Sequence, residues 1–209
     1  MLMDVTTVPV SEEAVVLRVP PRRRFTDTDV VAIQSLNPEL RLEVDGEGNL
    51  VAMLPAGAET SVINTELLGQ LADWLHRDGS GIAFGSSAGF RLPRTGSLRS
   101  PDAAWMTLDR WRALPRRQRR RFARVCPDFV AELCEPTDYL EALHAKMREY
   151  RDNGARLGWL LDPESRTVWV YREDAAEPDE LHDPSSVAGD PVLPGFVLDV
   201  KAVWRAAAI

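Results

Sequence analysis

Two spacings of apolar residues recur along the chain, one typical of helices and the other of strands. Residues 62–75 place apolar side chains three and four positions apart, which predicts an amphipathic helix of about four turns. Residues 137–153 show the same spacing, with Thr137 in position to cap the helix and Gly154 where a helix-ending glycine belongs. A shorter helix is predicted over residues 30–36, after a run of capping residues.

Short apolar runs between these helices predict strands. Residues 40–44 and 50–54 flank a Gly-rich turn, a pattern typical of a β-hairpin. The other predicted elements are strands at 15–19, 82–92, 103–106, 129–133, 156–161, 167–171 and 196–198, a helix at 109–124 and a short final helix. Because strands and helices mix without a strict β-α-β alternation, the predicted fold class is α/β (α+β), with a central mixed β-sheet flanked by helices.

Length and composition point to one globular domain. The chain has 209 residues, 44% of them hydrophobic and 27% charged, which is close to average globular usage. Two prolines and three arginines at 20–24 separate an expected N-terminal arm, residues 1–30, from a single domain over residues 31–209. No apolar run approaches the ~20 residues of a membrane-spanning helix, and acidic residues interrupt the N-terminus, so neither a span nor a secretory signal is expected.

Charge and reactive side chains narrow the function classes. A net charge of −7 makes nucleic-acid binding depend on a local basic patch. Two cysteines, Cys126 and Cys134, are too few for a disulfide framework, so a reducing cytoplasm is the expected location. The three histidines lie far apart, which disfavours a zinc site. Any metal would be held by carboxylates, which favours Mg²⁺ or Mn²⁺.

Two carboxylates stand in apolar surroundings. Asp102 directly precedes a predicted strand, and Glu132 lies inside another predicted strand among apolar neighbours. Strand alternation puts Glu132 on the same face as Val130 and Cys134. Burial of a lone carboxylate costs several kcal/mol unless the group is paired or bound to a metal. Two interpretations stay open at this point, an ion pair with an arginine and a metal ligand.

Lys146 is the third residue of interest. It is the only lysine before Lys201, in a chain that otherwise uses arginine. On its predicted helix it lies beside the apolar stripe of Leu143, Met147 and Tyr150, so its stem can be buried while its ammonium points along the edge of the sheet. An ordinary lysine that reaches from the helix into solvent has the same pattern.

Six short motifs follow one another along the chain. They are Arg99-Ser-Pro-Asp102-Ala, Cys126-Pro-Asp-Phe-Val-Ala-Glu132-Leu, Pro136-Thr-Asp138, Lys146-Met-Arg-Glu-Tyr150, Asn153-Gly-Ala-Arg-Leu-Gly-Trp-Leu-Leu-Asp-Pro163 and Leu193-Pro-Gly-Phe196. In this order the motifs resemble the Uma family (Uma-two) of restriction-endonuclease-like proteins, a branch of the PD-(D/E)XK nuclease superfamily. The resemblance covers roughly residues 40–204 and implies a restriction-endonuclease-like fold.

The resemblance implies a role for each acidic residue. Asp102 matches the first acidic residue of the superfamily and Glu132 the second. Glu59 matches an acid often found on the first core helix, although it could equally be a helix-dipole partner in a first turn. Two residues after the second acid the superfamily has a lysine, where this chain has Cys134. Lys146, on the following helix, resembles a displaced copy of that lysine.

The reaction implied by the resemblance is metal-dependent hydrolysis of a phosphodiester bond, in DNA. Asp102, Glu132 and the backbone carbonyl of Leu133 would hold Mg²⁺ or Mn²⁺. Lys146 would orient the attacking water or stabilise the charge of the transition state, and Glu59 would serve a second metal. Because cutting two strands suits two sites, a homodimer is expected.

An arginine-rich segment supplies the basic patch. Eight arginines fall between residues 110 and 124, shortly after Asp102. Such a segment could contact DNA phosphates beside the site, and the alternative is a solvated helix surface. The predicted contact residues are Arg116, Arg117, Arg119 and Arg120.

Other functions remain as alternatives. A nuclease fold can belong to a non-catalytic binding or assembly protein with an incomplete active site. Residues 85–89 match the G-x-S-x-G motif of serine hydrolases, but no predicted helix follows them and no histidine is placed as a base. A glycosidase would need a sugar cleft with grouped aromatic rings, and nothing except core packing groups Trp105, Trp111 and Trp159.

Overall fold

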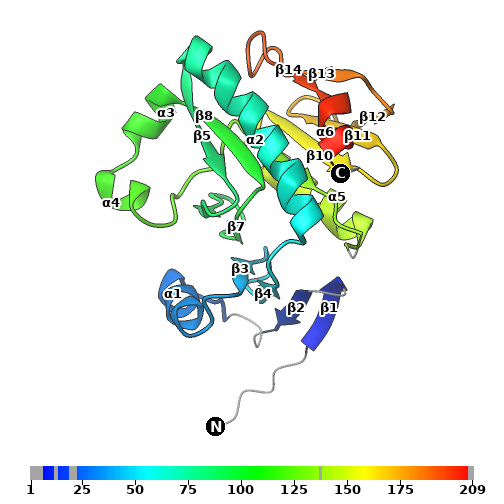
Figure 1. The fold of residues 1–209 in the computed structure, drawn as a ribbon. Coiled ribbons are helices and arrows are strands. Elements are labelled where there is room, and N and C mark those ends of the chain that lie inside the picture. Colours follow the sequence, from blue (N-terminus) through cyan, green and yellow to red (C-terminus); the bar gives the residue numbers. More distant parts are fainter. Residues whose placement is uncertain (1–6, 12–13, 19–22, 137, 207–209) are drawn as a thin grey trace.

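Two six-stranded sheets and a separate two-stranded ladder form the framework of the protein. The computed structural model describes residues 7–11, 14–18, 23–136 and 138–206 (Figure 1). The N-terminal sheet has the strand order β1-β2-β4-β3-β7-β6, with antiparallel neighbours. Its strands are β1 (Thr7–Ser11), β2 (Ala14–Leu17), β3 (Arg41–Val44), β4 (Leu50–Met53), β6 (Phe90–Arg91) and β7 (Leu98–Arg99).

The central sheet is mixed, as the sequence predicts. Its strand order is β12-β11-β10-β9-β8-β5, in which β9 and β10 run parallel and the other neighbours antiparallel. Its strands are β5 (Gly81–Gly85), β8 (Ala103–Thr107), β9 (Phe129–Leu133), β10 (Leu157–Asp162), β11 (Thr167–Arg172) and β12 (Asp179–His182). The ladder consists of β13 (Ser186–Ala188) and β14 (Val197–Asp199).

Helices cover both faces of the central sheet, which confirms the predicted fold class (Figure 1). On one face lie α2 (Ala58–Asp78) and α6 (Val200–Ala206), and on the other lies α5 (Leu140–Asp152). The remaining helices are α1 (Asp27–Leu36), α3 (Leu108–Ala113) and α4 (Arg116–Arg119). None of the described helices combines the length and the apolarity needed to cross a membrane.

Side-chain alternation along β9 assigns its residues to two cores. Phe129, Ala131 and Leu133 pack in the core beneath α2, and Val130 packs with Met147 of α5 on the other face. Because successive strand residues point to opposite faces, the side chain of residue 132 lies on the α5 side. The fold thus directs a carboxylate into the layer between the central sheet and α5.

The arginine-rich segment does not form the single helix predicted over residues 109–124. The chain forms α3 and α4 with Pro115 between them, and turns follow. Proline lacks the backbone N–H of a helix interior and its ring clashes with the preceding turn, so one helix cannot pass through this position. The other long helix begins at Leu140, and its predicted cap Thr137 lies outside the described residues.

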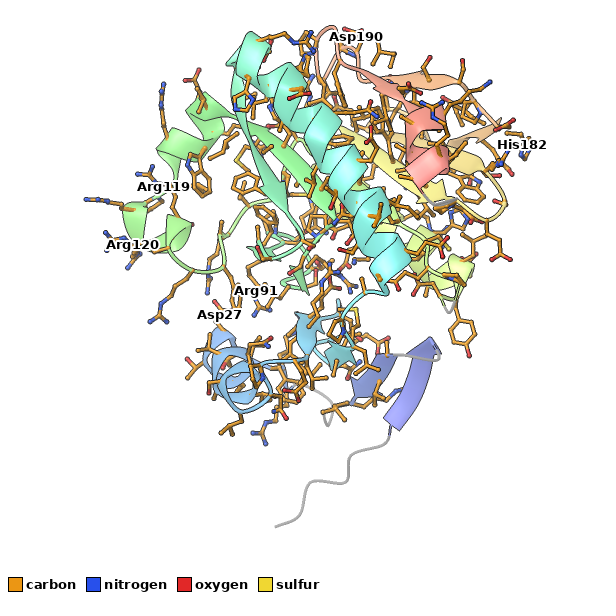
Figure 2. All side chains as sticks on the ribbon, viewed as in Figure 1. Asp27, Arg91, Arg119, Arg120, His182 and Asp190 are labelled. Atoms are coloured by element: carbon orange, nitrogen blue, oxygen red, sulfur yellow. The ribbon has the colours of Figure 1, made fainter. Side chains whose placement is uncertain are left out.

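The described N-terminal residues are joined to the rest of the fold. The predicted boundary at residue 30 falls inside α1, whose Val30 is buried against Leu42 and Val44 of β3. β2 pairs with β4 along its length. Arg91 of β6 also donates to Asp27 of α1 at 2.9 Å (Figure 2). These contacts join the residues on either side of the predicted boundary. The division into an arm and a domain at residue 30 stays a prediction.

A substitution at Gly81 can test how closely β5 packs against the side chain of Trp105. A Cβ at this position of β5 would lie 2.1 Å from the indole Nε1 of Trp105 on β8. We expect Gly81→Ala to lower the free energy of unfolding by about 1–3 kcal/mol, because the buried indole has to move. Urea denaturation measures this change.

Gly69 is the matched control. It lies on the exposed side of α2, where an added Cβ meets nothing within 4 Å. Gly69→Ala should raise the free energy of unfolding by up to about 1 kcal/mol, because alanine has the higher helix propensity. Equal stabilities of the two variants would contradict the close packing at Gly81.

Candidate active site

Strand register brings the two predicted acids together. β8 and β9 are antiparallel, with Ala103 opposite Ala131, so the next step of the ladder sets Asp102 opposite Glu132. The backbone N–H of Leu133 donates to Oδ2 of Asp102 at 2.9 Å. Two residues thirty positions apart in the chain therefore become neighbours because they occupy facing positions at the ends of paired strands.

Lys146 reaches the same place from α5. Its Nζ lies 2.8 Å from Oε1 of Glu132. Tyr150, one helical turn further along, shares its face and donates its hydroxyl to the same oxygen at 2.8 Å. The side chain of Lys146 is only 12% exposed. Of the two orientations left open by the sequence, the buried one toward the sheet is the one observed.

Glu43 is a fourth member of the cluster that sequence reasoning missed. This β3 residue is 1% exposed. Its Oε1 lies 3.1 Å from Nζ of Lys146 and accepts the backbone N–H of Ser100 at 2.8 Å. A signal was available, because Glu43 stands between Leu42 and Val44 just as Glu132 stands between apolar neighbours.

Two arginines complete the cluster. Arg99 of β7 donates to Oε2 of Glu43 at 3.0 Å and through Nε to Oε2 of Glu149 at 2.7 Å. Arg41 of β3 donates to Oδ1 of Asp102 at 3.2 Å and also to the backbone carbonyl of Ser100. The arginine partner that the sequence left as an alternative for a buried acid is thus present at Asp102, and at Glu132 the partner is a lysine.

Burial and charge set the protonation of the two glutamates. Burial by itself would raise the pKa of Glu43, but the cations Lys146 and Arg99 outweigh it and lower this pKa to about 2. At Glu132 burial dominates and raises the pKa to about 7. The positive charge of Lys146 opposes this rise in the pKa of Glu132, and the negative charge of Asp102 adds to it.

Lys146 remains an ammonium in this surrounding. Burial disfavours its charged form, but the carboxylates of Glu132 and Glu43 outweigh burial and raise its pKa above the ordinary value. A lysine held in this state at neutral pH supplies positive charge and hydrogen-bond donors. It is not placed to accept a proton.

Other predicted site residues lie elsewhere or act differently. Glu59 is exposed in the first turn of α2, and no contact among the described residues joins it to the cluster. Leu133 contributes its backbone N–H to Asp102. In the arginine-rich segment, Arg116, Arg117 and Arg120 are exposed, and the guanidinium of Arg119 lies over the ring of Trp111 at 5.9 Å.

The arginine-rich segment lies away from the cluster. β8 separates Asp102 from α3, and its five residues span about 17 Å at 3.3–3.4 Å each. In Figure 1, α3 and α4 lie at the left edge of the molecule, whereas α5 lies at the lower right. Arg119 and Arg120 lie at that left edge, and Arg120 is exposed there (Figure 2). Proximity to Asp102 in sequence therefore does not place these arginines beside it.

A cavity of about 590 Å³ opens between the N-terminal sheet and α5. Its walls include Val16 and Val51 from the sheet and Leu143 from α5, and Glu43 and Lys146 line it as well. Among the residues that the structure describes, seven acidic and four basic ones line the cavity. A cleft with this excess of negative charge attracts cations and repels a bare phosphate backbone.

The donor chemistry of the cluster fits a hard divalent cation. Carboxylates of Glu43, Asp102 and Glu132 are the oxygen ligands that Mg²⁺ and Mn²⁺ prefer. The mutual repulsion that contributes to the raised pKa of Glu132 is the kind that a cation relieves. Within the described ranges, however, no three His, Cys, Asp or Glu side chains form a ready-made metal cluster. Arg41 and Lys146 instead contact oxygens of the two acids.

Comparisons with known proteins agree with this architecture. A family model described as "Putative restriction endonuclease" (Uma2) matches residues 28–201. A crystal structure from Anabaena variabilis, described as a "putative nuclease belonging to DUF820", has 20% sequence identity and a TM-score of 0.70. The match covers 88% of this chain and 99% of that one, and at this identity it shows the fold alone. No curated protein matches the chain.

The pH dependence of stability tests the raised pKa of Glu132. Between pH 4.5 and 7 the folded protein holds a proton at Glu132 that the unfolded chain releases, so the free energy of unfolding falls as the pH rises through this window. Glu132→Gln removes that cost. We expect the variant to melt at a higher temperature than the wild type at pH 8, in chelator.

The advantage of the variant should shrink at pH 5, where the wild-type carboxyl is also neutral. Thermal unfolding at both pH values measures it, and an advantage that grows toward pH 5 would contradict the assignment. The charged and titratable groups that face Glu132 are Arg41 and Glu43 of β3, Asp102 before β8, and Lys146 and Tyr150 of α5.

Proposed function

Since this chain belongs to the Uma2 family of restriction-endonuclease-like proteins, we propose that it is a metal-dependent endonuclease that hydrolyses phosphodiester bonds in DNA. The observation that carries the proposal is the convergence of two acids and one ammonium. Asp102, Glu132 and Lys146 come from three separate segments: Lys146 forms an ion pair with Glu132, and Asp102 accepts the backbone N–H of Leu133, the residue after Glu132. Burying these charges is costly, and a catalytic requirement accounts for that cost.

Asp102 and Glu132 would hold the divalent cation, Mg²⁺ or Mn²⁺, with the backbone carbonyl of Leu133. When bound, such an ion supplies a Lewis acid that neutralises charge on the phosphoryl oxygens. Tyr150 fixes the orientation of the Glu132 carboxylate through its hydroxyl. Lys146 stabilises the negative charge of the transition state, because its raised pKa keeps it protonated.

Glu43 takes the place in this proposal that the sequence suggested for Glu59. Its low pKa keeps it ionised at neutral pH. From β3 it holds Lys146 by an ion pair of 3.1 Å while Glu132 holds the same ammonium from β9. Glu43 therefore positions the lysine and adds a third carboxylate to the cluster.

A non-catalytic nuclease-fold protein is the second candidate function, and one observation favours it. Arg41 already contacts Asp102, and Lys146 already contacts Glu132. A cluster completed by its own cations can serve stability or assembly without chemistry. Cleavage activity separates the two candidates.

DNA is the proposed partner, and the exposed arginines of α4 are the proposed phosphate contacts. β8 and α3 lie between Asp102 and α4, so these arginines would meet a duplex at a distance from the cleaved bond and not at it. A homodimer is part of the proposal, because two sites suit the cutting of two strands. The proposed location is the cytoplasm.

Nicking of supercoiled plasmid in Mg²⁺ or Mn²⁺ tests the reaction. We expect Asp102→Asn, Glu132→Gln and Lys146→Met each to lower the cleavage rate by about 10²-fold or more, since each removes a charge at the reacting group. Glu43→Gln should lower it as well, by loosening Lys146.

Glu173→Gln is the control for charge loss. Glu173 is an exposed residue paired with Arg156 at 3.2 Å. Its variant should cleave at the wild-type rate. Absence of cleavage by the wild type under all these conditions, or full activity of the Asp102 and Lys146 variants, would support the non-catalytic candidate instead.

Salt dependence of DNA binding tests the arginine-rich segment. Neutralising Arg116, Arg117 and Arg120 to glutamine should weaken DNA binding and reduce the slope of log K against log salt by up to about 0.9 per lost phosphate contact. Fluorescence anisotropy with a labelled duplex in Ca²⁺ measures the slope. A matched triple variant at the exposed arginines Arg77, Arg166 and Arg205 removes the same charge elsewhere and should leave the slope nearly unchanged.

A further inference from the structure

Arg41 differs from the other two cations of the cluster by its exposure. Its side chain is 28% exposed, against 12% for Lys146 and 13% for Arg99. It stands two residues before Glu43 on β3 and therefore on the same face of the strand. It also lines the cavity between the N-terminal sheet and α5, whereas its partner Asp102 is not among the lining residues. Arg41 thus stands between the cavity and Asp102.

The hydrogen bonds of Arg41 are incomplete. Its Nε is buried and has no partner among the described residues. Its 3.2 Å contact with Asp102 is longer than the ~2.7–2.9 Å typical of charge-assisted hydrogen bonds. Arg99, by contrast, uses Nε at 2.7 Å and also reaches a second carboxylate. The guanidinium also donates to the backbone carbonyl of Ser100, a neutral acceptor, so it can keep that hydrogen bond while its charge turns from Asp102 to another anion.

The charges of the cluster indicate which cation would leave when a metal ion binds at Asp102. The cluster contains four carboxylates, those of Glu43, Asp102, Glu132 and Glu149, against three cations. A divalent cation at Asp102 would lie beside the guanidinium of Arg41, and two positive groups at one carboxylate repel each other. All three cations line the cavity, but Arg41 is the most exposed of them and the one that contacts Asp102, so it is the one that a cation at Asp102 would displace.

We propose that Arg41 competes with the divalent cation for Asp102 and, once displaced into the cavity, binds a phosphate of the substrate. The inference rests on the proposed function in one respect, that Asp102 is a ligand of the cation. The planar guanidinium fork matches a phosphate through two parallel hydrogen bonds. A cavity whose described lining has seven acidic and four basic residues repels a phosphate unless a cation is presented to it.

The two halves of the proposal predict opposite effects of one substitution. In Arg41→Ala, Mn²⁺ should bind about fivefold more tightly, because no internal cation has to leave Asp102. A labelled DNA oligonucleotide, in Ca²⁺, should bind about tenfold more weakly, because a charge-assisted contact to phosphate is lost. Isothermal titration calorimetry measures the first and fluorescence anisotropy the second, both on the full chain without turnover.

Two further variants interpret the result. Arg41→Lys keeps the charge but loses the fork, so Mn²⁺ affinity should stay near that of the wild type while DNA binding still weakens. Arg156→Ala removes an arginine paired with Glu173 at 3.2 Å, outside the cluster, and should change neither affinity. If Arg41→Ala lowers both affinities together with the melting temperature, or leaves Mn²⁺ affinity unchanged, the proposal is wrong.

Asp102→Asn separates this inference from the proposed function. If Asp102→Asn binds Mn²⁺ as tightly as the wild type, Asp102 is not a ligand and the proposed function fails at that residue. If Asp102→Asn loses Mn²⁺ binding but Arg41→Ala gains none, the nuclease proposal stands and only the competition by Arg41 is refuted.

Discussion

The ammonium of Lys146 lies between two buried carboxylates, and the rest of the site depends on that position. At 2.8 Å from Glu132 and 3.1 Å from Glu43, it compensates acids carried by two different sheets. Without it, two desolvated carboxylates would face each other, and loss of one partner from such a buried set costs about 3–5 kcal/mol. The same contact joins β3 of the N-terminal sheet, β9 of the central sheet and α5. The candidate site therefore also holds the two sheets and α5 together.

Glu43 and Glu132 share this ammonium but differ in protonation, because their other neighbours differ. Glu43 has a second cation in Arg99, so it stays ionised well below neutral pH. Among the described residues, Glu132 has Lys146 alone as a cation within ion-pair distance, and it faces Asp102, so its proton is held up to about pH 7. Two chemically identical side chains thus acquire different properties from their neighbours, and the one that resists ionisation is the one a divalent cation would relieve.

The sequence predicts much of this arrangement, for identifiable physical reasons. Glu132 could be found because a carboxylate among apolar neighbours needs a partner, and strand alternation gave its face correctly. Glu43 has apolar neighbours as well, but it lies in a predicted hairpin, and that pattern argues against its burial. A two-stranded hairpin implies one solvated face, and the burial of Glu43 arises from packing against β7 and α5, residues 50 or more positions away. The position of the arginine-rich segment relative to Asp102 could not be predicted for the same reason, because it depends on the course of β8.

Cys134 leaves the end of β9 without a positive charge. It follows Glu132 by two residues and shares its strand face, where the superfamily pattern has a lysine. Burial raises the pKa of the Cys134 thiol to about 12, so this side chain is neutral at pH 7 and offers no charge to the site. α5 packs across that same face, and Lys146 projects from it onto Glu132. The interaction with the carboxylates depends on where the ammonium lies. It does not depend on whether the lysine belongs to a strand or to a helix.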